Sequence, residues 1–251
     1  MRASSPGIQA RAFVLLFWVS STPAFGGDAS IRPDFSSIDP VKNRIFFFSG
    51  LDVARDSAFG WAGVAAAPFA GLEEDGLRVR ISGGAGRYRY RTPATSSGLN
   101  EASVAAGELL AGFHRSFANG AITVYVGPHV EEQRLADPDA GNAAAGTAFG
   151  LKAAIEAYAR LDPVWLVNAS ASASTVHRAY HVRAALLREL APFAIGIEGA
   201  VYGDVRYVEP RAGIYASTTY GRSVLTLAGG ALSNSDKGRG IYATLSLYAP
   251  Y

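Results

Sequence analysis

The sequence predicts an all-β fold, a transmembrane antiparallel up-and-down β-barrel of about twelve strands. Three observations support this prediction. Hydrophobic residues make up 49% of the 251 residues and charged residues 18%, yet after residue 30 no apolar run reaches the ~20 residues of a membrane-spanning helix. Apolar and polar residues alternate with period two along most of the chain. The last segment has one unbroken apolar face, which ends on the aromatic residue Tyr251.

The amino-terminal residues have the pattern of a signal peptide that is cleaved during export. Arg2 and Arg11 provide positive charge, an apolar run follows at residues 12–19, and small residues suited to cleavage occur at 22–26. The predicted divisions of the chain are a signal peptide (1–26), a periplasmic amino-terminal segment (27–43) and the barrel (44–251).

From residue 44 onward, segments of about ten residues alternate with turn-forming pairs such as Asn119-Gly120 and Asp162-Pro163. Strands of this length span a bilayer when tilted, and single-chain bacterial barrels have an even number of strands. Residues 101–113 are also compatible with a helix, but their glycines and their alternation favour a strand. The predicted strands are 44–54, 57–68, 76–90, 101–115, 121–134, 146–159, 163–174, 177–188, 191–203, 206–218, 222–232 and 239–251.

The connections between these strands indicate which end of the barrel faces outward. The longer ones, around 91–100, 135–145 and 233–238, all fall on the same side. Bacterial barrels usually have long outward loops and short periplasmic turns. We therefore expect this side to face the cell exterior.

Each predicted strand has two different faces. Phe149 and Ile155 share one face of their strand, and Lys152 and Glu156 share the other. A soluble barrel with its apolar face inside would show the same alternation. The last strand favours the membrane alternative, because its apolar face and its aromatic end at Tyr251 resemble the signal read by the outer-membrane assembly machinery.

Charged residues within the strands should therefore point into the lumen, since a charge that faces the lipid midplane would cost about 2–4 kcal/mol. Their mixed signs favour a network of ion pairs that fills the interior over a solute path. No single sign dominates, as it would in a selective channel. The predicted network consists of Arg78, Arg80, Glu108, Lys152, Glu156, Arg183, Glu198, Glu209 and Arg211.

Seven tyrosines are expected to lie inward or near a membrane interface: Tyr88, Tyr90, Tyr125, Tyr158, Tyr202, Tyr207 and Tyr215. An interface girdle is the interpretation we prefer, and stacking on sugar rings is the alternative. Gly83, Gly84 and Gly86 predict a β-bulge, because the alternation ahead of them changes phase at Tyr88 and Tyr90.

Few residues suggest chemistry. The chain has no cysteine, which excludes disulfides and thiol catalysis, and its net charge of +2 without a basic run gives no sign of nucleic-acid binding. His177 and His181 have the spacing of a helical metal pair, but their segment reads as a strand. We therefore predict no metal site and no cofactor.

One catalytic arrangement is conceivable from the sequence. His114 and Ser116 share a strand face, and Glu131 or Glu132 on the next strand would complete a nucleophile, base and carboxylate set. Some outer-membrane lipid A deacylases have a similar arrangement. Ser116, however, precedes a predicted periplasmic turn, whereas lipid A occupies the opposite leaflet. We predict no catalytic residue.

Several stretches resemble the family of cellulose biosynthesis protein BcsS, and the resemblance covers most of the chain after the predicted signal peptide. It departs from the family pattern at 136–146 and at the final Ala249-Pro250-Tyr251. The similar stretches are Phe48-Ser49-Gly50-Leu51-Asp52, Asp56-Ser57, Trp61-Ala62-Gly63, residues 75–80, residues 84–90, Tyr125-Val126-Gly127 with His129 and Glu131, residues 196–199, and Tyr242-Ala243-Thr244.

This resemblance implies an outer-membrane protein of a Gram-negative bacterium that is associated with cellulose production. It brings no catalytic residue with it. Twelve strands form a narrower cylinder than the ~16–18 strands of a wide channel, so we expect a non-enzymatic accessory to cellulose biosynthesis or secretion. Its expected partners are outer-membrane lipid and cellulose or cellulose-secretion components. The alternatives are a small-solute channel and a lipid A-modifying enzyme.

Overall fold

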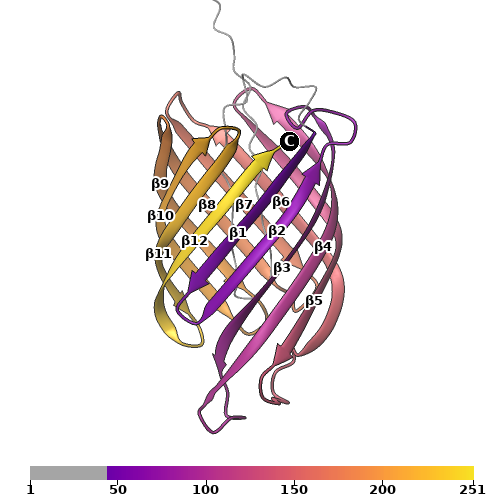
Figure 1. Cartoon of the computed structure of the whole chain (residues 1–251), viewed down its shortest axis with the longest axis vertical. Helices are drawn as coiled ribbons and strands as arrows, with labels where there is room; N and C mark the ends of the chain where they lie inside the picture. Colours follow the sequence, from indigo (N-terminus) through magenta and orange to yellow (C-terminus); the bar gives the residue numbers. More distant parts are fainter. Residues whose placement is uncertain (1–43) are drawn as a thin grey trace, which may run out of the picture.

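The computed structural model describes residues 44–251, which form a closed antiparallel β-barrel (Figure 1). Each strand pairs with its neighbours in sequence, and β1 pairs with β12 to close the cylinder. The strands are β1 (Ile45–Ala54), β2 (Ser57–Ala66), β3 (Gly76–Arg91), β4 (Leu99–Phe117), β5 (Gly120–Leu135), β6 (Gly146–Arg160), β7 (Trp165–Ser174), β8 (Tyr180–Leu190), β9 (Phe193–Gly203), β10 (Val208–Tyr220), β11 (Ser223–Asn234) and β12 (Gly238–Pro250).

The predicted fold class and strand number are confirmed over these residues. The segment that was also compatible with a helix lies within β4. The predicted signal peptide and periplasmic segment lie outside the described residues. In the described part of the chain, no helix has the length and apolar character to cross a bilayer.

The predicted start of the eighth strand is wrong. Residues 175–179 form a five-residue connection, and β8 begins at Tyr180. His177 and Arg178 have φ angles of 52° and 53°, in the left-handed region that an extended strand cannot contain. His177 therefore lies in a connection, and only His181 lies in a strand.

The two ends of the barrel differ in their connections (Figure 1). We call one end the turn end, where the connections are 67–75, 118–119, 161–164, 191–192 and 221–222 and where β1 begins and β12 ends. We call the other end the loop end, where the connections are 55–56, 92–98, 136–145, 175–179, 204–207 and 235–237. The long connections predicted to share one side all lie at the loop end.

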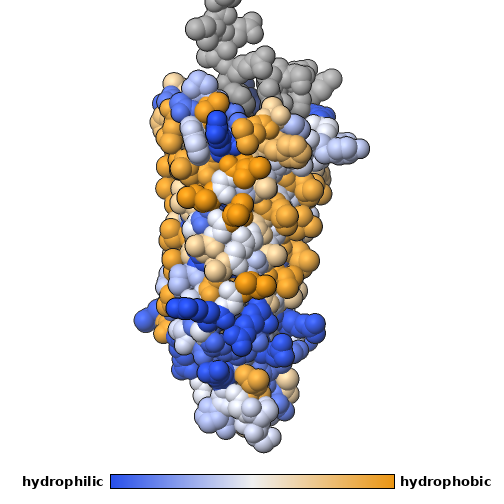
Figure 2. Space-filling view, turned by 90° about the vertical axis from the view of Figure 1, so that its left-hand side faces the viewer, coloured by the Kyte–Doolittle hydropathy of each residue, from blue (hydrophilic) through white to orange (hydrophobic). Residues whose placement is uncertain are grey.

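The outer surface carries the apolar face of each strand. Phe149 is 80% exposed and Ile155 40%, whereas Lys152 and Glu156 of the same strand are buried in the lumen. Figure 2 shows apolar side chains over much of one outer face and hydrophilic side chains gathered toward the loop end. The predicted inside-out arrangement, with polar residues in the lumen, is therefore what the chain adopts.

The predicted bulge in β3 is wrong. The strand pairs with β2 and β4 in unbroken register, so Tyr88 and Tyr90 keep the inward face of Arg80. The change in the sequence pattern reflects the outer face, which turns from apolar residues to exposed arginines at Arg87, Arg89 and Arg91. Gly86 serves packing instead, because a Cβ there would lie 2.3 Å from the ring of Phe59.

The turn-end half of the lumen holds an aromatic cluster. Phe46 and Phe48 of β1 are 1% and 3% exposed, and the ring of Phe46 packs 4.8 Å from that of Tyr248 on β12. Trp61 of β2 belongs to the same cluster. The inward residues near the turn end are therefore apolar and aromatic, and the first inward ionic residue of β1 is Asp52, farther toward the loop end.

Candidate functional site in the lumen and at the loop end

A first ionic cluster crosses the lumen between β3, β4 and β6. Arg80 lies 3.1 Å from a carboxylate oxygen of Glu108 and 2.5 Å from one of Glu156. Lys152 lies 2.5 Å from the other Glu108 oxygen, and the Ser82 hydroxyl donates to Glu108 at 2.8 Å. The side chains of Arg80 and Lys152 are fully buried, so two cations and two carboxylates balance each other away from water.

Two further groups lie on the opposite wall. Arg183 of β8 donates from Nε to Glu198 of β9 at 2.9 Å. Arg211 of β10 donates to both carboxylate oxygens of Asp52 on β1, at 2.8 and 3.1 Å, and from Nε to Glu209 at 2.8 Å. The contact with Glu198 links the neighbouring strands β8 and β9, whereas the contact of Arg211 with Asp52 joins two strands that are distant in the sequence.

Tyrosine rings cover the lumen arginines. The guanidinium carbon of Arg80 lies 4.5 Å from the ring centre of Tyr125, that of Arg183 lies 4.7 Å from Tyr215, and that of Arg211 lies 4.7 Å from Tyr202. Such cation–π contacts stabilise a buried charge. These three tyrosines and Tyr158 are buried in the lumen, so the predicted interface girdle is wrong for them.

Arg78 differs from the other predicted network members. Its guanidinium donates to the carbonyl oxygens of Gly71, Leu72 and Glu74 at 3.2, 2.9 and 2.6 Å. It thereby fixes the 67–75 connection against the inside of the turn end. Asp52 also belongs to the lumen network, although it was not among the predicted members. Its parity with Phe46 and Phe48 on β1 was a usable sign that it points inward.

The residues considered above as a conceivable catalytic set come together only in part. Nε2 of His114 lies 3.2 Å from Oγ of Ser116, but Nδ1 faces the Thr123 hydroxyl at 2.8 Å. The Ser116 hydroxyl donates to the backbone carbonyl of Glu73 at 2.9 Å. Glu131 lies eight residues beyond Thr123 on β5, roughly 26 Å along a strand. Glu131 therefore does not complete a triad with His114 and Ser116.

The histidines do not form a metal site. Nε2 of His177 lies 3.6 Å from a carboxylate oxygen of Glu131, and the ring of His181 stacks on Tyr202 at 4.4 Å. Among residues 44–251, no group of three or more His, Cys, Asp or Glu side chains is placed to bind a metal ion.

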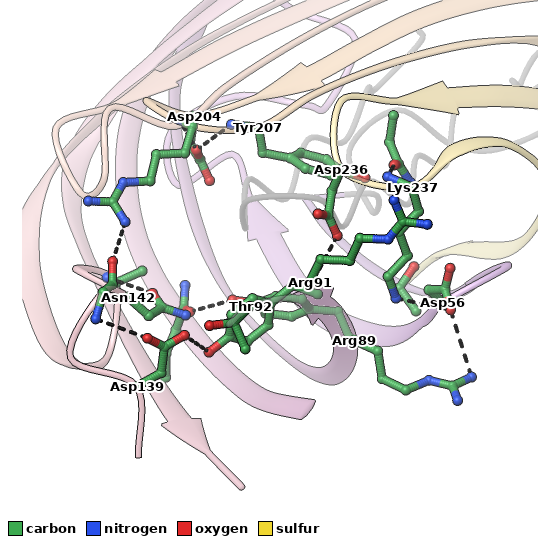
Figure 3. A pocket seen from close by; sticks show the side chains of 18 of the residues that line it. Asp56, Arg89, Arg91, Thr92, Asp139, Asn142, Asp204, Tyr207, Asp236 and Lys237 are labelled. Atoms are coloured by element: carbon green, nitrogen blue, oxygen red, sulfur yellow. Dashed lines mark hydrogen bonds and ion pairs between the residues drawn. The ribbon is translucent and has the colours of Figure 1, made fainter. Parts of the chain in front are cut away.

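A cavity of about 670 Å³ occupies the loop end, and we call it the vestibule (Figure 3). Its walls come from the loop-end parts of the strands and from all six loop-end connections, 55–56, 92–98, 136–145, 175–179, 204–207 and 235–237. Gln133 and Glu209 are the most buried polar residues of its lining, and we call them its floor. The polar and charged side chains that line it include Arg55, Asp56, Tyr88, Arg89, Tyr90, Arg91, Gln133, Asp139, Asn142, His177, Asp204, Arg206, Tyr207, Glu209, Asp236 and Lys237.

Three half-buried tyrosines line this vestibule, and their hydroxyl groups are held in place. Tyr88 donates to Gln133 at 2.8 Å, Tyr90 donates to Asp139 at 3.0 Å, and Tyr207 donates to Glu209. The rings of Tyr88 and Tyr90 lie 5.8 Å apart and are tilted by 43°. Hydrogen bonds of the phenol hydroxyl groups therefore fix the orientation of all three rings.

The charges of the vestibule balance one another. Its lining contains five basic side chains (Arg55, Arg89, Arg91, Arg206 and Lys237) and five carboxylates (Asp56, Asp139, Asp204, Glu209 and Asp236). Lys237 lies 3.2 Å from Asp56, and Arg206 donates to the carbonyl of Gly141. Asp236 accepts from the backbone N–H of Arg91 at 3.0 Å. The rim therefore presents polar groups without a net formal charge.

Three titratable groups in the loop-end connections have shifted pKa values. Hydrogen bonds from Thr92 and Tyr90 lower the pKa of Asp139, and burial lowers the pKa of His177. Burial and the neighbouring Glu209 carboxylate raise the pKa of Tyr207. Each shift keeps the group in the form it has at neutral pH.

Several solved structures share the barrel architecture at low sequence identity. The KdgM porin in complex with disordered oligogalacturonate has 6% identity and a TM-score of 0.44, over 82% of this chain and 99% of that one. The transport unit of the autotransporter AIDA-I from Escherichia coli has 8% identity and a TM-score of 0.44, over 87% and 93%. OprB from Pseudomonas putida at low pH has 9% and 0.35, over 83% and 92%.

At TM-scores below 0.5, these similarities imply nothing about what the chain binds or transports. A search among curated proteins found no significant match. The family model described as cellulose biosynthesis protein BcsS matches residues 46–251, which is nearly the whole described barrel. The match agrees with the resemblance seen in the first and last strands, and the chain therefore belongs to the family of cellulose biosynthesis protein BcsS.

Proposed function

We propose that this protein is a non-enzymatic outer-membrane component that supports the synthesis, secretion or surface retention of bacterial cellulose without serving as its main pore. Family membership over residues 46–251 supports the link to cellulose. The observation that carries the accessory role is the ionic filling of the lumen. The cluster around Arg80 and Glu108 and the bridge from Arg211 to Asp52 occupy the space that an extruded glucan would need.

The proposed location is the outer membrane of a Gram-negative bacterium, reached by export through the periplasm. The exposed apolar belt and the apolar face of β12, which includes Ile241, Leu245 and Leu247, support this location. If the chain enters β1 from the periplasm, the turn end, where β1 begins, faces the periplasm. The loop end and its vestibule would then face the cell exterior.

The absence of an enzymatic role is likewise part of the proposal. The His114 imidazole faces the Thr123 hydroxyl where a catalytic triad would need a carboxylate. The Ser116 hydroxyl is engaged with a backbone carbonyl. Neither contact supports activation of a serine nucleophile.

A clean deletion in the producing bacterium tests the proposal. Extracellular cellulose, measured as glucose released by cellulase, should fall in the deletion strain and recover on complementation with the wild-type gene. Membrane fractionation of the complemented strain should place the protein with outer-membrane markers. Unchanged cellulose in the deletion strain would refute the accessory role.

A further inference from the structure

We propose that the vestibule is a binding site for a neutral β-linked glucan, and that it takes a chain end or a short oligosaccharide. This inference rests on the proposed function, because the link to cellulose suggests which sugar to test. The site itself is argued from the geometry of its walls, its floor and its charges.

The walls offer the surfaces that a pyranose ring needs. The axial C–H groups of a β-linked glucose unit form two flat apolar faces, and its equatorial hydroxyl groups form a polar edge. Tyr88, Tyr90 and Tyr207 provide half-buried aromatic rings, and aromatic side chains with a polar tip suit a ligand that is apolar on one side and polar on the other. Hydrogen bonds already hold these rings, so binding orders few side chains.

The polar groups between the rings match sugar hydroxyls. Asn142 and Asp204 line the same cavity (Figure 3), and amide and carboxylate groups supply donors and acceptors for hydroxyl groups, which can both donate and accept. A mostly apolar cavity with a few placed polar groups is the usual form of a small-molecule site.

The charge balance selects for a neutral ligand. Basic and acidic side chains are equal in number around the vestibule, and the cation of Lys237 already pairs with Asp56. An acidic polysaccharide would need an excess of cations, and it would meet Asp139, Asp204 and Asp236 instead. A neutral glucan has no such conflict.

The floor determines how the glucan would bind. Gln133 and Glu209 are 2% and 3% exposed, and Glu209 is joined below to Arg211, which bridges to Asp52. A polymer that passed into the lumen on this side would have to displace these contacts. The vestibule would therefore hold the end of a glucan chain at the cell surface, in agreement with a role in retention and not in conduction.

Calorimetric titration of the purified full-length protein in lipid nanodiscs tests this inference, with cellohexaose as the probe. Maltohexaose tests the linkage, and a hexamer of galacturonic acid tests the charge. We expect saturable binding of cellohexaose and weaker or no binding of the other two. No saturable binding of cellohexaose, or tighter binding of the acidic hexamer, would overturn the proposal.

Variants of the rings locate the site. Tyr90→Ala and Tyr207→Ala should each weaken cellohexaose binding about twofold to tenfold, which is the effect of losing one aromatic contact. Tyr90→Phe keeps the ring but loses the hydrogen bond to Asp139, so it should bind nearly as well as wild type. The matched control is Tyr220→Ala, which removes a tyrosine that is 86% exposed at the turn end and should leave binding unchanged.

The ring variants also separate this inference from the proposed function. Wild-type affinity in both alanine variants would refute the vestibule as the site, whatever the deletion strain shows. Normal cellulose in the deletion strain, with saturable and tyrosine-dependent binding in vitro, would refute the accessory role and leave the binding site standing.

Discussion

Arg211 on β10 and Asp52 on β1 form a two-pronged hydrogen-bonded ion pair, although 159 residues separate them in the sequence. Their strands are not neighbours, since β11 and β12 lie between them around the wall. The pair therefore reaches past two intervening strands inside the barrel and ties its first strand to its tenth. The Thr244 hydroxyl of β12 donates to the same carboxylate at 2.6 Å.

Replacement of this arginine should destabilise the barrel strongly. Arg211→Met leaves the Asp52 carboxylate buried without its cation, and loss of one partner of a buried pair costs about 3–5 kcal/mol. The free energy of unfolding can be measured by urea titration in detergent. Arg87→Met is the control, because Arg87 is exposed on the outer face and should change stability by less than about 0.5 kcal/mol. Equal effects of the two substitutions would contradict this account.

The cluster between β4 and β6 should show energetic coupling. Lys152→Met removes one of two cations from Glu108 and leaves Arg80 and Ser82 in contact with it. Glu108→Gln removes the charge that Lys152 pairs with. A double-mutant cycle between them should give a coupling energy of about 0.5–3 kcal/mol, measured by the same urea titration. Additive effects would mean that the two side chains do not stabilise each other.

A methyl group at Gly50 should disturb the aromatic cluster. A Cβ there would lie 2.1 Å from the Trp61 ring, so Gly50→Ala should destabilise the barrel by about 1–3 kcal/mol through overpacking. Gly199→Ala is the matched control, since the nearest atom to its Cβ would be 4.0 Å away. Melting temperatures of the two variants would check this, and a normal melting temperature for Gly50→Ala would show that Trp61 moves freely.

The filled lumen should pass little ionic current. Arg80 and Lys152 are fully buried side chains, so ions would have to displace a network of charge pairs. We expect no stepwise conductance from the purified protein in a planar bilayer under conditions in which an open porin conducts. Regular steps from the wild type would support the channel alternative in place of the accessory role.

Binding of cellohexaose should depend little on pH between about 6.5 and 9. The ordinary pKa values of Asp and His lie at or below this window, and that of Tyr lies above it. The pKa shifts widen it, since those of Asp139 and His177 are lowered and that of Tyr207 is raised. Titration at several pH values would check this. At pH below about 6.5 the unfolded chain protonates His177 more readily than the folded one does, so acid should weaken the barrel. A loss of binding between these pH values would contradict the assignment of an ionised Asp139, a neutral His177 and a protonated Tyr207.

Local patterns account for most of what could be predicted. Period-two alternation placed Lys152 and Glu156 on the face opposite Phe149, and the apolar last strand with its aromatic end indicated that the polar face is the inner one. Turn-forming residues located the strand ends to within two residues, except for the start of β8. One prediction was wrong because two different structures can produce the same sequence pattern. The change after Ile81 suggested a bulge, but it reflects arginines on the outer face beyond the apolar belt. The start of β8 was predicted wrongly because His177 and Arg178 adopt left-handed backbone angles, which their residue types do not indicate.

By itself, the sequence determined the fold class, the strand number and the face on which most strand residues lie, because alternation and turn chemistry act between residues that are near in the chain. Only the tertiary structure decided which charges meet and where a cavity remains. Closure and tilt of the barrel set the heights at which non-adjacent strands face each other across the lumen. Asp52 thus meets Arg211, and residues from separate connections, such as Asp139 and Tyr207, share one vestibule.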